Sequence, residues 1–117
     1  MIKPRDPREL AVDLLERSTC TVQVAAVLAD DFGIFSWGHN HVGFDGLGQH
    51  AEAEAIRRAN RKRAKGATIY VAAIRKRNQK IVTALPCVEC TLRIRAAKIS
   101  RVVWRSAEGK WYEASIR

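Results

Sequence analysis

Residues 86–116 read PCVECTLRIRAAKISRVVWRSAEGKWYEASI and predict one helix followed by a β-hairpin. Pro86 suits the first turn of a helix that ends near Lys98. The two segments after it, 101–104 and 111–116, are rich in β-branched and aromatic residues, as strands are. Six residues connect them, and a parallel crossover needs a dozen or more. The last two strands are therefore expected to pair antiparallel.

The residues before this stretch alternate between predicted helices and strands. Asp6 and Pro7 have the pattern of a helix start, and this first helix is expected to end near Arg17. The other expected elements are a hairpin of strands 21–28 and 34–38 around an Asp-Asp-Phe-Gly turn, a loop at 41–49, a helix at 50–65, a strand at 68–74 and a short returning strand at 80–83. This order predicts an α/β fold with three helices around one mixed sheet.

Length and composition favour a single globular domain covering residues 1–117. The chain has 47% hydrophobic residues and a formal net charge of +9, and no apolar run is long enough to cross a membrane. This composition argues against a disordered tail or a collagen-like chain. Because the first eight residues contain no apolar signal-peptide core, we expect a cytoplasmic protein without a membrane partner.

The positive charge is concentrated in two stretches, RRANRKRAK at 57–65 and a second cluster at 75–80. Such stretches are either solvated faces that aid solubility or surfaces for a polyanionic partner. Neither stretch contains an interleaved aromatic residue, whereas single-strand binders pair charge with base-stacking rings. Charge alone therefore leaves single-stranded nucleic acid open as a partner.

Two short motifs place metal-binding and acidic side chains at helix starts. His50, Ala51 and Glu52 open one predicted helix, and Cys87 and Cys90 lie three residues apart at the start of another. This pair, H-x-E with P-C-x-x-C, is the signature of zinc nucleobase deaminases. One imidazole and two thiolates leave a tetrahedral Zn²⁺ an open position for water, which the metal converts to hydroxide near neutral pH. Glu52 is then free to carry protons.

Two other interpretations of the cysteines stay open at this point. A closed structural zinc site would need a fourth ligand, for which Cys20, His39 and His41 remain. A C-x-x-C pair can also be a thioredoxin-like redox site. The odd number of cysteines and their spacing favour a metal site over structural disulfides.

The sequence is similar to the cytidine deaminase-like superfamily. The similarity rests on the two motifs, on the hairpin ending in Gly38-His39-Asn40 and on the helix-to-strand passage at 95–104. The resemblance covers about four fifths of the chain in the order that the fold requires. It implies a three-layer α-β-α sandwich with a mixed five-stranded sheet. It also implies one Zn²⁺ per chain, bound by His50, Cys87 and Cys90, with Glu52 as the proton shuttle. The residues that it implies for substrate contact are Asn40, Ala51 and Pro86.

The sequence departs from parts of this family in two ways. The antiparallel last hairpin points away from the tRNA adenosine deaminase branch, whose last strands are parallel, and toward the branch of cytidine, blasticidin S, viral and toxin deaminases. Free cytidine deaminases usually read P-C-G-x-C, whereas Val88 replaces that glycine here, and residues 75–83 form a basic hairpin. The substrate is therefore less defined than the reaction.

The sequence thus predicts a hydrolase that replaces the exocyclic amine of cytosine with a carbonyl, acting on a C–N bond of a cyclic amidine. The leading substrate is a cytidine-type nucleoside or nucleotide, because a short chain has few elements left to hold a polymer. Cytosine editing in single-stranded DNA or RNA is the second hypothesis. A third is a non-catalytic, zinc-stabilised module that binds nucleic acid. The resemblance also implies a homo-oligomer.

Overall fold

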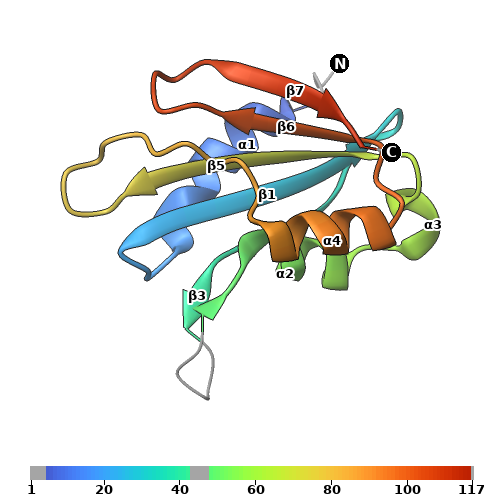
Figure 1. The fold of residues 1–117 in the computed structure, drawn as a ribbon, viewed down its shortest axis with the longest axis horizontal. Helices are drawn as coiled ribbons and strands as arrows, with labels where there is room; N and C mark the ends of the chain where they lie inside the picture. Colours follow the sequence, from blue (N-terminus) through green and yellow to red (C-terminus); the bar gives the residue numbers. More distant parts are fainter. Residues whose placement is uncertain (1–4, 43–47, 117) are drawn as a thin grey trace.

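The computed structural model describes residues 5–42 and 48–116, which form one five-stranded sheet with helices on both faces (Figure 1). Its helices are α1 (Pro7–Leu14), η1 (Leu15–Arg17), α2 (Ala51–Arg58), α3 (Arg61–Ala64) and α4 (Val88–Ala96). Its strands are β1 (Val22–Asp30), β2 (Gly33–His39), β3 (His41–Val42), β4 (Gly48–Gln49), β5 (Thr68–Arg75), β6 (Arg101–Arg105) and β7 (Trp111–Ser115). No helix in this part of the chain has the length and hydropathy needed to span a membrane.

The sheet has the strand order β2-β1-β5-β6-β7 and is mixed. Strands β5 and β6 are parallel, joined by a crossover that contains α4, and every other neighbouring pair is antiparallel. In the last pair Arg101 lies opposite Ser115 and Arg105 opposite Trp111. The expected antiparallel hairpin at the end of the chain is therefore confirmed.

The central strands of the sheet are buried on both faces, which produces the three layers expected from the sequence. On one face Ala11, Leu14 and Leu15 of the N-terminal helical segment pack with Ala25 and Val27 of β1. On the other face α2 and α4 pack through buried residues that include Ala51, Ala55 and Ile94. Central strands β1 and β5 are apolar at almost every position because side chains on both faces are covered.

The single helix expected over 50–65 is wrong, because the structure has two helices there. Ala59 adopts an extended conformation with ψ of 149°, which ends α2. The side chain of Asn60 then accepts hydrogen bonds from the backbone amides of Lys62 and Arg63 and caps α3. Asparagine is a strong N-cap, so this local bond competes with continuation of the helix. The break turns the basic residues of α3 away from the axis of α2.

Two further expectations about strands and loops are corrected. Part of the loop expected at 41–49 is a two-stranded ladder, in which His41 pairs with Gln49 and Val42 with Gly48. The rest of that expected loop, 43–47, lies outside the described residues. The strand expected at 80–83 is reduced to a single bridge between Ile74 and Ile81.

Strand β2 lies very close to helix α2, and Gly38 makes this approach possible. A Cβ atom built on Gly38 would lie 2.8 Å from both the Ala51 carbonyl oxygen and the Ala55 amide nitrogen. The neighbouring atoms are backbone, so they cannot rotate away as a flexible side chain could. This contact fixes the start of α2, and hence His50 and Glu52, against the sheet.

Replacing Gly38 with alanine is expected to lower the free energy of unfolding by about 1–3 kcal/mol, the usual cost of overpacking a core. Urea denaturation followed by circular dichroism measures this change. Gly66→Ala is a comparison that reports backbone strain without overpacking, because no atom lies within 4 Å of its Cβ position but its φ is +82°. An equal free energy of unfolding for Gly38→Ala and the unaltered protein would contradict the close approach of β2 to α2.

Candidate active site

Three side chains of the types that bind transition metals converge where α2 and α4 begin. His50 is the N-cap residue of α2, Cys87 is the N-cap residue of α4, and Cys90 lies in the first turn of α4. One ligand atom from each lies within 4.8 Å of the others. The motifs are separated by more than thirty residues in the sequence, so packing of α2 beside α4 brings them together (Figure 1).

The distances within this cluster fit a zinc ion. His50 Nδ1 lies 3.2 Å from Cys90 Sγ and 3.7 Å from Cys87 Sγ. Ligands in a tetrahedral zinc site, with bonds near 2.3 Å to sulfur and 2.0–2.1 Å to nitrogen, lie about 3.5 Å apart. The donor set of one imidazole and two thiols is also one that zinc prefers. His50, Cys87 and Cys90 are thus positioned as zinc ligands.

The cluster has a buried side and an open side. Cys90 is only 1% exposed, whereas His50 and Cys87 are exposed. Burial, together with the nearby Glu52 and Cys87 charges, raises the pKa of the Cys90 thiol well above its usual value. A divalent cation reverses this balance, because a coordinated thiol is deprotonated. The open side leaves room for a small molecule next to the ligands.

The cluster contains three protein ligands. Among the described residues, no fourth histidine, cysteine or carboxylate belongs to it. His41 instead pairs with Glu54 at 3.1 Å, and the imidazole of His39 lies against the Asn40 carbonyl at 3.3 Å. In this part of the chain the geometry is that of an open site and not of a closed structural one.

Glu52 lies beside the cluster in a nearly dry environment. Its side chain is on the first turn of α2, and the residue is 5% exposed. Burial raises the pKa of the Glu52 carboxyl above its usual value, although its own backbone amide and the neighbouring His50 oppose the shift. A carboxylate in this position can exchange a proton with a molecule in the open site.

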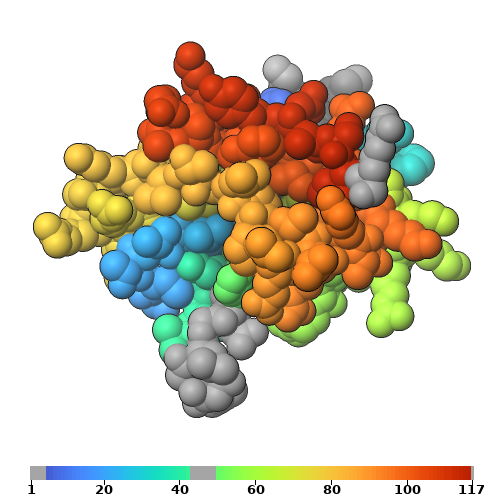
Figure 2. Space-filling model, viewed as in Figure 1, coloured from blue at the N-terminus to red at the C-terminus, as the bar shows by residue number. Residues whose placement is uncertain are grey.

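A pocket of about 280 Å³ opens next to His50, Glu52 and Cys87. In Figure 2 the segments near residues 20 (blue), 50 (green) and 87 (orange) meet on the front of the molecule. Ala51 and Asn40 line this pocket, and their contact with substrate stays a prediction. Pro86 does not line it, although its neighbours Leu85 and Cys87 do, so its contact with substrate stays a prediction.

The Asn40 side chain is held in one orientation by β1 and by Ser18. Its Oδ1 accepts hydrogen bonds from the Ser18 hydroxyl and from the Val24 amide, the latter at 2.9 Å. Its Nδ2 donates to the Val22 carbonyl at 2.8 Å. One N–H of the amide group remains. The remaining N–H of Asn40 can therefore donate a hydrogen bond to a ligand in the pocket. An acceptor such as a hydroxyl or ring oxygen suits it best.

Sequence patterns missed other residues of this site. Cys20, which the sequence offers only as a candidate fourth ligand, lies outside the ligand cluster but lines the same pocket as Cys87. Ser18, which is 2% exposed, orients Asn40 and had no recognisable motif. Val24 and Ala73 form part of the apolar wall because they lie opposite each other in the β1–β5 ladder. A local pattern cannot reveal these contacts, since each joins segments that are distant in sequence.

Comparisons with known proteins agree with this geometry. Residues 5–106 match the family model described as the cytidine and deoxycytidylate deaminase zinc-binding region. No curated protein matches the chain. Among solved structures, cytidine deaminase from Burkholderia pseudomallei is similar with a TM-score of 0.69 and 23% identity, over 93% of this chain and 89% of that one.

Two other solved structures share the fold at lower similarity. Cytidine deaminase from Mycobacterium tuberculosis has a TM-score of 0.56 and 17% identity, over 82% of this chain and 78% of that one. RibD from Acinetobacter baumannii has a TM-score of 0.60 and 24% identity, and the chain matches 26% of its length. At these identities the likeness concerns the fold.

Proposed function

The chain belongs to the cytidine and deoxycytidylate deaminase zinc-binding family, and on this basis we propose that it deaminates a cytidine-type nucleoside or nucleotide. The family assignment makes it a zinc-dependent deaminase with the cytidine deaminase-like fold. The observation that carries the proposal is the placement of Glu52 in the same pocket as His50 and Cys87. A proton carrier and a metal cluster thus face one small cavity.

In the proposed reaction, His50, Cys87 and Cys90 hold the zinc ion. When bound, zinc lowers the pKa of water to around 7 and so supplies a nucleophile at neutral pH. Water adds to the ring carbon that bears the exocyclic amine, and the amine leaves as ammonia, so that a carbonyl replaces it. No oxidant or second substrate is needed.

Glu52 has the position to move every proton that this hydrolysis requires. It accepts one from the attacking water, donates one to the ring nitrogen beside the attacked carbon, and assists protonation of the departing amine. Its burial next to His50 excludes bulk water that could compete for these protons. Because its carboxylate is not part of the ligand cluster, it is free to alternate between the two protonation states.

The pocket itself favours a small substrate. A cavity of about 280 Å³ is at the lower end of the range for ligand sites. Asn40 offers an N–H donor at its wall, which suits an oxygen of a sugar. Ala51 lines the pocket at the start of α2 with its side chain buried in the core, so a base there would meet its backbone.

The proposal is tested by mass spectrometry of the products from zinc-loaded protein. Free cytidine, deoxycytidine and their monophosphates are incubated in parallel with single-stranded oligonucleotides, and Glu52→Ala is the control. We expect a gain of about 1 Da, the exchange of NH for O, in a free nucleoside or nucleotide only. Lack of conversion of every free compound would contradict the proposed substrate class.

Deamination of cytosine in single-stranded DNA or RNA is the second candidate function. The cationic side chains along the α2, α3 and α4 segments favour it. In that case activity on an oligonucleotide should fall steeply between about 50 and 200 mM salt, because phosphate contacts release counterions.

The single-domain boundary, the cytoplasmic location and the homo-oligomer remain predictions. Light scattering measures the oligomeric state.

A further inference from the structure

A groove of about 770 Å³ lies between α2–α3 and α4, on the outer side of these helices. Its walls carry five cationic side chains, Arg57, Arg61, Lys65, Arg93 and Lys98. Its floor includes small apolar residues such as Ala53 and Ala96. Figure 2 shows the side chains of α3, in yellow-green, projecting at the right beside α4 in orange. The groove is distinct from the zinc pocket, since the two share no lining residue.

Most of the positive charge in this groove is not neutralised by the protein. Within residues 5–42 and 48–116, no ion pair includes Arg57, Arg61, Lys65 or Lys98. Arg93 pairs with the exposed Glu89, and the acidic lining residue Glu54 is engaged by His41 and Arg58. A second copy of this chain on the same face would place cations against cations. The complementary occupant is therefore an anion.

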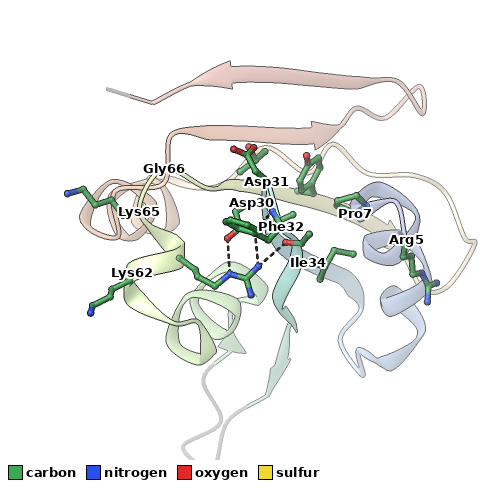
Figure 3. Close-up of a pocket in the computed structure, with 14 residues that line it drawn as sticks. Arg5, Pro7, Asp30, Asp31, Phe32, Ile34, Lys62, Lys65 and Gly66 are labelled. Carbon is green, nitrogen blue, oxygen red and sulfur yellow. Dashed lines mark hydrogen bonds and ion pairs between the residues drawn. The ribbon is translucent and has the colours of Figure 1, made fainter. Parts of the chain in front are cut away.

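An exposed aromatic ring lies at the next cavity along the same surface. Phe32, at the tip of the β1–β2 turn, is 92% exposed. It lines a cavity of about 880 Å³ together with Lys62 and Lys65 of the α3 segment. Figure 3 shows Phe32 near the centre of this cavity and the two lysines extending outward on one side. Lys65 lines both cavities, so the ring and the groove form a continuous surface.

Charged and aromatic contacts hold the turn that carries Phe32 against α3. Arg63 donates two hydrogen bonds of 2.8 Å to the Asp30 carboxylate, and its guanidinium lies 4.5 Å from the Phe35 ring centre. The Arg63 contact lowers the pKa of Asp30 to about 2, so this acid stays charged and paired. Asp31 is the other acidic residue of the cavity. The Phe32 amide also donates a hydrogen bond of 2.9 Å to the Asp30 carboxylate, so the backbone that carries the ring is held beside α3.

We propose that this surface binds single-stranded nucleic acid, with phosphates in the groove between α2 and α4 and an unpaired base stacked on Phe32. Single-strand binders combine a cationic groove with an aromatic ring, and stacking needs a base that is not paired. Guanidinium groups such as those of Arg57 and Arg61 match phosphate geometry well. The proposal concerns binding and does not depend on the substrate of the zinc pocket.

The Phe32 end of the binding surface lies far from the zinc pocket along the sheet, whereas the groove begins beside that pocket, since Ala53 lines the groove and Glu52 lines the pocket. Val22 at the start of β1 lines the zinc pocket, and Asp30 at its end lines the Phe32 cavity. The nine residues of β1 span about 26 Å. A base stacked on Phe32 would therefore lie several nucleotides from the reaction centre. Nucleic-acid binding at this surface is compatible with a free nucleotide as the substrate of the zinc pocket. It is equally compatible with a polymer that is held here while it reacts.

The test is fluorescence anisotropy of labelled 20-nucleotide dT and rU oligomers with the zinc-loaded protein over a range of salt. We expect binding that weakens linearly in log salt. The triple variant Arg57→Gln, Arg61→Gln and Lys65→Gln should flatten that slope by about 2, since each lost phosphate contact contributes about 0.7. Phe32→Ala should weaken binding by about 5- to 100-fold at every salt concentration without changing the slope.

The matched control removes the same charge from the basic hairpin, as Lys76→Gln, Arg77→Gln and Lys80→Gln. These three residues are exposed, like those of the groove variant, and glutamine removes the charge in both variants while keeping a polar side chain. Binding by this control should stay within about twofold, because its cations lie outside the groove. Equal losses in both triple variants would show that only net charge matters and would overturn the proposal.

Three other results would also overturn it. Unchanged affinity in Phe32→Ala would show that no base stacks on the Phe32 ring. Tighter binding of a glutamate-rich peptide than of the oligomers would identify an acidic protein as the partner. Absence of any binding by the unaltered protein at about 50 mM salt, where phosphate contacts are strongest, would exclude nucleic acid. Circular dichroism and zinc content check that each variant is folded.

Discussion

Glu52→Gln is expected to reduce kcat for deamination by about 10²- to 10⁴-fold, the usual contribution of a general acid–base residue. Glutamine has nearly the same shape but cannot accept the proton from the attacking water. Because Glu52 is buried beside His50, no bulk solvent can readily substitute for it. The substitution removes a charge from the pocket without opening a cavity. The loss should therefore appear in kcat far more than in substrate affinity.

Steady-state kinetics with the substrate identified by mass spectrometry measure this loss. Zinc content should stay unchanged, because Glu52 is outside the ligand cluster. Glu54→Gln is the matched control, since Glu54 lies on the same helix but lines the outer groove and not the zinc pocket. We expect the control to retain most of its activity. Full activity in Glu52→Gln would refute the proton-carrier role.

Each of the single substitutions His50→Ala, Cys87→Ala and Cys90→Ala is expected to abolish zinc binding and activity together. Three protein ligands are the minimum of a catalytic zinc site, so losing one leaves a site that cannot retain the ion. Cys90→Ala should also destabilise the fold most, because Cys90 is buried whereas His50 and Cys87 are exposed. Mass spectrometry under native conditions and elemental analysis give the zinc content.

Cys20→Ala is the matched control for the loss of a thiol. Cys20 lines the same pocket but lies outside the ligand cluster, so zinc content should remain at about one ion per chain. This comparison separates coordination from general effects of cysteine removal. Full metal content in any of the three ligand variants would contradict the assignment of that residue.

The last hairpin and the metal cluster could be predicted from the sequence because local rules govern both. Five residues between 101–105 and 111–115 cannot form a parallel crossover, whatever surrounds them. The spacing of Cys87 and Cys90 places both thiols on the first turn of one helix. Such constraints act within a few residues, so tertiary context did not alter them.

Elements whose boundaries depend on competition between local bonds were predicted less well. The residues from 50 to 65 favour a helix throughout, yet the Asn60 side chain captures the amides of Lys62 and Arg63 and starts a new helix. Similarly, the strand expected at 80–83 forms only one bridge. Propensity summed along a segment does not show which of two nearly equal conformations packs better.

The sequence by itself determined the chemistry of this protein, since the identity and spacing of the donors and of Glu52 restrict which metal and which reaction are feasible. Only the tertiary structure decided what surrounds that chemistry. It places Cys20 at the zinc pocket and Ser18 against the Asn40 side chain, and it sets Phe32 beside the lysines of the α3 segment. The basic stretch contains no aromatic residue of its own. Contacts between segments thirty residues apart arise from packing of the whole chain, and no periodicity within either segment encodes them.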